Sequence, residues 1–72
     1  MQRFHVASTS IASIGYEAET RVLEIEFRDS GWVYRYFEVP PAEYEAFLRA
    51  DSKGAYLNQT LKKRGYRYGR IR

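Results

Sequence analysis

The sequence predicts an α+β fold in which a three-stranded antiparallel meander is followed by two helices packed on one face of the sheet. Alternating apolar and polar residues before the Pro40-Pro41 pair indicate strands, and helical periodicity after it indicates the two helices. The chain has 72 residues and no cysteine, so one small domain must fold without disulfides. Large aromatic side chains are therefore expected to supply much of the core.

Three strands are expected, at residues 11–17, 21–28 and 32–39. In the second, Leu23, Ile25 and Phe27 alternate with charged residues, a pattern typical of a sheet with one covered and one exposed face. A turn at 18–20 joins the first two strands. Glycine at position 31 favours a tight turn before the third.

The length of that second turn decides which side chains share a face. A two-residue loop at 30–31 places Phe27 opposite Tyr34 and Ile25 opposite Tyr36, whereas a three-residue loop would bury a charge. We therefore expect both tyrosines of this first Tyr-Arg-Tyr segment to face the core. Its central arginine is expected to form an exposed ion pair.

That arginine is Arg35, and its expected partner is Glu24 or Glu26.

Two helices are then expected, at residues 41–50 and 53–64. The first has its apolar stripe at Tyr44, Phe47 and Leu48, which leaves Glu43 outside the packed face. Ser52 is expected to cap the second helix, and Gly65 is expected to end it.

Charge is divided unevenly along the chain. Residues 1–61 contain six cations and nine carboxylates, a net charge of −3, whereas residues 62–72 contain six cations and no acid. We expect a single domain at 1–64 and a basic C-terminal tail at 65–72, which lacks periodicity and is expected to be mobile in isolation. The second Tyr-Arg-Tyr segment lies in this tail.

Three segments occur in a distinctive order, STSIASIGYEAETRVLEIEF, VYRYFEVP and SKGAYLN. Together they resemble the KTSC domain, a small module found alone in bacteria and phages and at the C-terminus of some lysyl-tRNA synthetases. The resemblance covers residues 6–64. It implies an antiparallel sheet with two helices, and the synthetase fusions suggest an RNA-binding role. Leu57 stands where the family pattern has an aromatic residue, which weakens a stacking role there.

The basic tail is the main candidate for a functional site. Its tyrosines interleave with arginines, a pattern that suits stacking on bases and neutralising phosphates in RNA or single-stranded nucleic acid. The candidate residues are Lys53, Lys62, Lys63, Arg64, Tyr66, Arg67, Tyr68, Arg70 and Arg72. With about five phosphates neutralised, the slope of log K against log salt should be about −3.5.

Other interpretations of these residues stay open. The tail is alternatively a solubilising end, an extra edge strand or a contact for an acidic protein, and Lys53 is alternatively part of ordinary helix capping. A second function is a protein-interaction module that regulates a larger machine such as a polymerase or ribosome. Its expected docking surface is an exposed apolar patch of Trp32, Val33 and Phe37.

Catalysis is not expected, because the chain has one histidine, no thiol and no catalytic or phosphate-loop motif. A domain this thin is expected to have little room for a cavity of about 300 Å³. No cofactor, metal or membrane segment is predicted. We expect a monomer in the cytoplasm.

Overall fold

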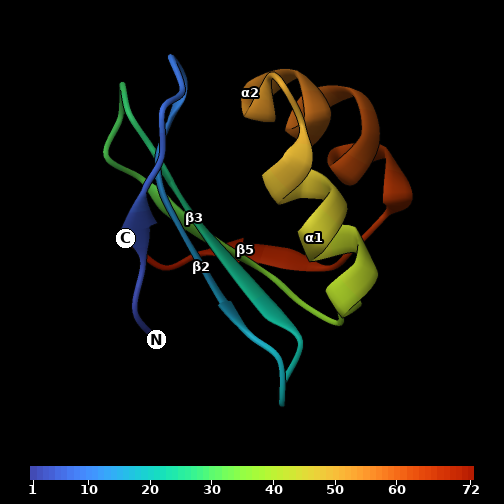
Figure 1. The fold of residues 1–72 in the computed structure, drawn as a ribbon. Coiled ribbons are helices and arrows are strands. Elements are labelled where there is room, and N and C mark those ends of the chain that lie inside the picture. Colours follow the sequence, from blue (N-terminus) through green and yellow to red (C-terminus); the bar gives the residue numbers. More distant parts are fainter.

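The computed structural model describes all 72 residues as one antiparallel sheet with helices on one face (Figure 1). The sheet has five strands in the order β1-β2-β3-β4-β5. Their bounds are β1 Phe4–His5, β2 Ile11–Glu17, β3 Val22–Phe27, β4 Val33–Tyr36 and β5 Tyr68–Arg70. The α+β class is confirmed, but the expected three strands are wrong, because both ends of the chain also pair with the sheet.

The N-terminal segment forms one edge of the sheet. In β1, Phe4 pairs with Ile14 of β2. The residues before β1 lie over the face that carries no helices, here called the outer face. A Cβ atom at Gly15 would lie 2.6 Å from the carbonyl oxygen of Gln2. Glycine is thus the residue that lets β2 pass beneath the N-terminal segment.

β2 has the bounds expected from the sequence, whereas β3 and β4 are shorter than expected. Left-handed backbone at two positions explains the difference. Arg21 has φ +58° and closes the turn before β3, and Glu38 has φ +57° and ends the extended conformation after β4. The two strands pair over residues 23–26 of β3 and the whole of β4.

The register between β3 and β4 differs by two residues from the one expected. Ile25 lies opposite Tyr34, and Leu23 lies opposite Tyr36. The loop has four residues, 28–31, rather than two, since the N–H of Phe27 bonds to the carbonyl of Trp32. A shift of two residues keeps every side chain on its expected face, so the prediction of shared faces is right although the partners are wrong.

The helical layer begins with α1 at Pro41–Arg49. One continuous helical segment follows and changes its winding along its length. It comprises α2 at Lys53–Tyr56, the π-helical η1 at Leu57–Leu61 and the 3₁₀-helical η2 at Lys62–Arg64. The expected cap is confirmed, because Ser52 Oγ accepts the Ala55 N–H at 3.2 Å. Gly65, with φ +81°, ends the segment as expected.

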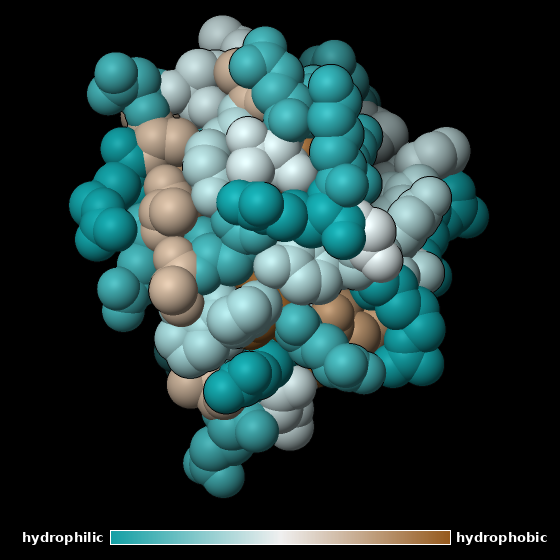
Figure 2. All heavy atoms as spheres, turned by 90° about the vertical axis from the view of Figure 1, so that its right-hand side faces the viewer, coloured by the Kyte–Doolittle hydropathy of each residue, from teal (hydrophilic) through white to brown (hydrophobic).

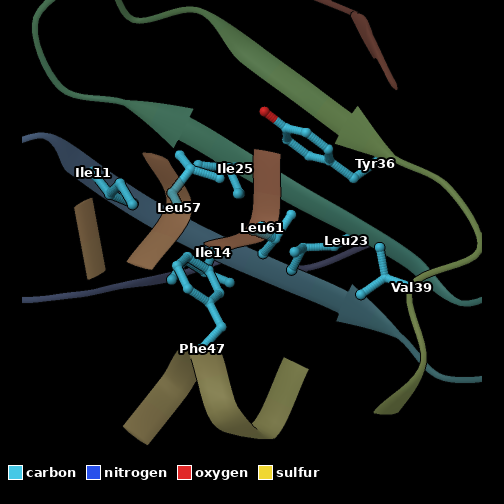
Figure 3. Packing of buried hydrophobic residues seen from close by; sticks show 9 residues of the cluster. All are labelled: Ile11, Ile14, Leu23, Ile25, Tyr36, Val39, Phe47, Leu57 and Leu61. Carbon is cyan, nitrogen blue, oxygen red and sulfur yellow. The ribbon is translucent and has the colours of Figure 1, made fainter. Parts of the chain in front are cut away.

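The core lies between the helices and the sheet (Figure 3). Phe47 extends from α1 toward the sheet, and Tyr36 approaches from β4. The nine buried residues of the cluster are Ile11, Ile14, Leu23, Ile25, Tyr36, Val39, Phe47, Leu57 and Leu61. Seven of them are aliphatic, so aromatic residues contribute to the centre of the core less than expected and pack mainly against its periphery. Six of the twelve aromatic side chains pack around this core. The surface on the helix side is largely hydrophilic to neutral (Figure 2).

The outer face carries a polar network that was expected to be an exposed ion pair. Glu24 is only 2% exposed and accepts hydrogen bonds from Arg3 and from Arg35, the latter at 2.8 Å. Burial alone would raise the pKa of Glu24, but the bonds and charges of the two arginines lower it overall. Glu24 is thus the expected partner of Arg35, but the carboxylate is buried because the N-terminal segment covers it.

Candidate functional site

The two Tyr-Arg-Tyr segments meet at one edge of the sheet. Residues 66–72 do not form a separate tail, because β5 pairs with β4 in antiparallel register. Tyr68 lies opposite Tyr36, with ring centroids 5.5 Å apart, and 6.0 Å from Tyr34. The pairing continues past β5, where the Ile71 N–H bonds to the Val33 carbonyl at 2.8 Å. The two repeats thereby contribute to a single surface.

A groove of about 490 Å³ lies on the helix side of the sheet, beside β4 and β5. This volume contradicts the expectation that the domain has little room for a cavity. We call it the aromatic groove. It is lined by Ser10, Phe27, Asp29, Ser30, Trp32, Tyr34, Tyr36, Lys62, Tyr66 and Tyr68.

Exposed rings and nearby cations define the chemistry of the aromatic groove. Tyr68 is 60% exposed and Trp32 is 46% exposed, so part of each ring is open to solvent, although Tyr36 stacks against Tyr68. The guanidinium of Arg70 lies 4.2 Å from the Trp32 ring centroid. The Lys62 ammonium lies 5.9 Å from the ring centroid of Phe27. These contacts place positive charge directly beside flat apolar surfaces.

Glu43 of α1 holds the C-terminal segment in position. Its buried carboxylate accepts hydrogen bonds from the hydroxyl of Tyr56, from Arg64 Nε at 2.8 Å and from the Tyr66 hydroxyl at 3.0 Å. The expectation that Glu43 lies outside the packed face is wrong, because donors from two later segments converge on it. Burial alone would raise the pKa of Glu43, but these bonds and the charge of Arg64 lower it overall.

Two tyrosines of the aromatic groove have strongly shifted ionisation. Burial, followed by the neighbouring Tyr68 and Tyr34, raises the pKa of Tyr36 to about 12. Burial, followed by the hydrogen bond to Glu43, raises the pKa of Tyr66 to about 12. Both phenols therefore keep their protons at a higher pH than an ordinary tyrosine does.

The structure brings four of the nine predicted site residues to the aromatic groove, either in its lining or over one of its rings. They are Lys62, Tyr66, Tyr68 and Arg70. Arg64 is paired with Glu43 instead, and Arg67 stacks 4.7 Å from the Phe37 ring centroid on the outer face. Each of these two arginines therefore already contacts another side chain of the domain.

The remaining three predicted residues do not line the aromatic groove. Lys63 and Arg72 are exposed at the helix end and the chain end. Lys53 borders a different, polar hollow together with Ser52 and Arg28. Ser52 caps α2, so ordinary helix capping, the alternative given for this segment, is what the structure shows for that serine.

Sequence reasoning missed groove residues within the first aromatic strand and before it. Phe27, Trp32 and Tyr34 line the aromatic groove, where Phe27 and Tyr34 also pack against the edge of the core, and Asp29 and Ser30 lie beside them. One signal was available: positions 32, 34 and 36 share a face, and so do 66, 68 and 70. Pairing these two stripes predicts a continuous aromatic and cationic surface.

The apolar patch expected for a protein partner does not form. Val33 is 1% exposed, and Phe37 lies beneath Arg67. Trp32 points to the opposite face from both, since neighbouring residues of a strand alternate sides. No His, Cys, Asp and Glu side chains gather in a group of three or more that suits a metal ion. No helix has the length and apolar character needed to cross a membrane.

These features define a small α+β domain with a ligand-sized aromatic groove at one end of its sheet. A model of the KTSC domain family matches residues 7–66, so the chain belongs to the KTSC domain family. A crystal structure of a KTSC domain protein from Yersinia pestis is similar over 99% of this chain and 97% of that one, with 38% identity and a TM-score of 0.90.

Two relatives show the range of proteins that contain such a segment. An uncharacterized protein of Stutzerimonas stutzeri is 48% identical over 71 residues, which cover 99% of both chains. A lysine–tRNA ligase of Nostoc punctiforme is 48% identical over 52 residues, which cover 72% of this chain and 9% of the ligase. The similar segment is thus a whole small protein in one case and a minor part of a large one in the other.

Proposed function

We propose that this domain binds single-stranded nucleic acid, with RNA as the first ligand, and that it does so without catalysing a reaction. One observation carries the proposal: the aromatic groove presents accessible rings with cations beside them. The face of a base stacks on such a ring, and each stacked base contributes about 1–3 kcal/mol. The adjacent cations neutralise the phosphates that connect the bases.

A single strand or a loop suits this surface better than a duplex. Bases in a duplex are stacked on each other, so their faces reach an aromatic ring only when the strand is open. The aromatic groove, at about 490 Å³, falls within the size range of about 300–1,000 Å³ typical of small-ligand sites. Individual bases of a flexible strand are therefore the units we expect it to hold.

The positions of the cations change the expected salt dependence. Arg64 is paired with Glu43, and Arg67 lies on the outer face, so neither is available beside the groove. Lys62 and Arg70 remain next to its rings. With about two or three phosphates neutralised, the slope for a single strand is about −1.4 to −2, which is about a tenfold loss of affinity from 50 to 200 mM salt.

The relatives support RNA as the first ligand to test. Some of them are named lysine–tRNA ligase, and the segment similar to this chain forms only 9% of the ligase from Nostoc punctiforme. An RNA contact added by such a segment agrees with the groove chemistry. The activity of the whole ligase is not inferred for this chain.

The test uses the intact chain and fluorescein-labelled uridine oligonucleotides, with binding measured by anisotropy. We expect Tyr68→Ala to weaken binding by at least about fivefold, since one stacking surface is lost. Lys62→Gln should weaken binding and reduce the salt slope by about 0.7. Arg49→Gln removes the same charge from the exposed end of α1 and serves as the matched control.

A salt-independent signal, or equal effects of Lys62→Gln and Arg49→Gln, would contradict the proposal. If no oligonucleotide binds the intact chain at all, the nucleic-acid function is wrong, and a protein partner becomes the function to pursue.

A further inference from the structure

One side chain of the aromatic groove does not fit a surface made only for phosphates and ring faces. Asp29 lines the groove and is exposed, and none of the three ion pairs includes it. A free carboxylate next to a polyanion repels its phosphates. Such a carboxylate favours binding only where the ligand offers hydrogen-bond donors to it.

The neighbouring serine supplies a complementary group. Ser30 Oγ accepts the N–H of Trp32 at 3.0 Å, and this leaves the hydroxyl hydrogen free to donate. Asp29 and Ser30 lie together in the four-residue loop 28–31, which leads directly into Trp32. The loop therefore presents two acceptor oxygens and one donor at the end of a stacking surface.

We propose that this loop reads the Watson–Crick edge of a guanine base stacked in the aromatic groove, an inference that rests on the proposed function. The guanine edge carries two adjacent donors, N1–H and the N2 amino group, and an acceptor, O6. The donors pair with the two oxygens of Asp29, and O6 accepts from the Ser30 hydroxyl.

The other bases fit this loop less well. Adenine and cytosine each turn a ring-nitrogen lone pair toward the carboxylate, which is repulsive. Uracil has a single ring donor flanked by two carbonyl oxygens. Only guanine offers two neighbouring donors to a carboxylate, so the loop selects for it even though stacking itself tolerates every base.

The experiment varies one base and one side chain. Fluorescein-labelled UUGUU, UUAUU and UUUUU, together with a pentamer that has inosine at its centre, are titrated with the intact chain and followed by anisotropy. We expect UUGUU to bind about tenfold more tightly than UUAUU. Inosine lacks the N2 amino group, so its affinity should fall between the two.

The variant Asp29→Asn should abolish the preference for guanine and leave the affinity for UUUUU unchanged or slightly higher. Asp51→Asn removes the same charge from an exposed position outside the aromatic groove and should keep the preference.

Two outcomes separate this inference from the proposed function. If the oligonucleotides bind with equal affinity, or if Asp29→Asn strengthens binding to all of them equally, guanine reading is wrong and stacking remains. If none binds, both the inference and the proposed function fail.

Discussion

The two Tyr-Arg-Tyr segments, 34–36 and 66–68, have the same sequence but different surroundings. In both, the arginine points to the outer face and the tyrosines to the helix side. Tyr36, on a strand paired on both edges, is 3% exposed, whereas Tyr68, on the edge strand, is 60% exposed. The pattern of residues thus sets the direction of a side chain, and its position in the sheet sets its burial.

Substituting one tyrosine from each segment should give the largest difference in the free energy of unfolding. Tyr36→Ala should lower the free energy of unfolding by about 3 kcal/mol, because a cavity replaces a buried ring. Tyr68→Ala should lower it by about 1 kcal/mol or less, since most of that ring is in water. Urea denaturation of both variants measures the difference, and equal losses would contradict the burial assigned to the two rings.

The hydrogen bonds of Glu43, which attach the second segment to α1, should give the next largest effect on stability. Glu43→Ala should cost about 2 kcal/mol, because Tyr56, Arg64 and Tyr66 all lose their acceptor. Glu45→Ala on the exposed side of the same helix is the control and should change little. Thermal unfolding of both variants decides whether Glu43 holds the segment.

The same carboxylate makes a prediction for acid pH. Its pKa in the folded chain is lowered below the ordinary value of 4.5, so its contribution is complete above that value and is lost as the pH falls through the folded pKa. The stability of the wild type should therefore fall more steeply in acid than that of Glu43→Ala. Parallel curves for the two proteins between pH 5 and pH 2 would show that Glu43 contributes nothing.

The central arginines of the two segments, Arg35 and Arg67, should show the smallest difference in stability. Arg35→Gln should cost about 1–2 kcal/mol, since the buried Glu24 keeps Arg3 but loses its second charged partner. Arg67→Gln should cost about 0.5 kcal/mol, the value of an exposed contact between a cation and a ring. Differential scanning calorimetry resolves the two, and a larger effect at Arg67 would reverse the roles assigned here.

Strong periodicity made much of the fold predictable from the sequence. β2, α1, the second helical segment and the shared faces of β3 and β4 follow from alternation, capping and turn residues. β5 was expected only as one open alternative for the tail, an extra edge strand, because Tyr68, Gly69 and Arg70 carry little strand signal. Its pairing depends on the open edge of β4 about thirty residues earlier, which local patterns do not describe.

The candidate site was predictable only in its chemistry. Tyrosines among cations predicted a surface for stacking and phosphate contact, and the structure brings Tyr68, Lys62 and Arg70 together at the aromatic groove. Phe27 and Tyr34 were missed because aromatic residues on a covered face were assigned to the core, and Trp32 was missed because it was assigned to an exposed apolar patch. Glu43 was missed because a carboxylate in the first turn of a helix is usually solvated, and its three donors come from residues 56–66.

β5 contributes to the aromatic groove but not to the buried cluster. Every residue of the buried cluster lies between Ile11 and Leu61, and the family match ends at residue 66, whereas Tyr68 and Arg70 come later. Substitutions at Tyr68 or Arg70 should therefore change the rim of the aromatic groove without loosening the interior, so the rim and the core can be altered independently.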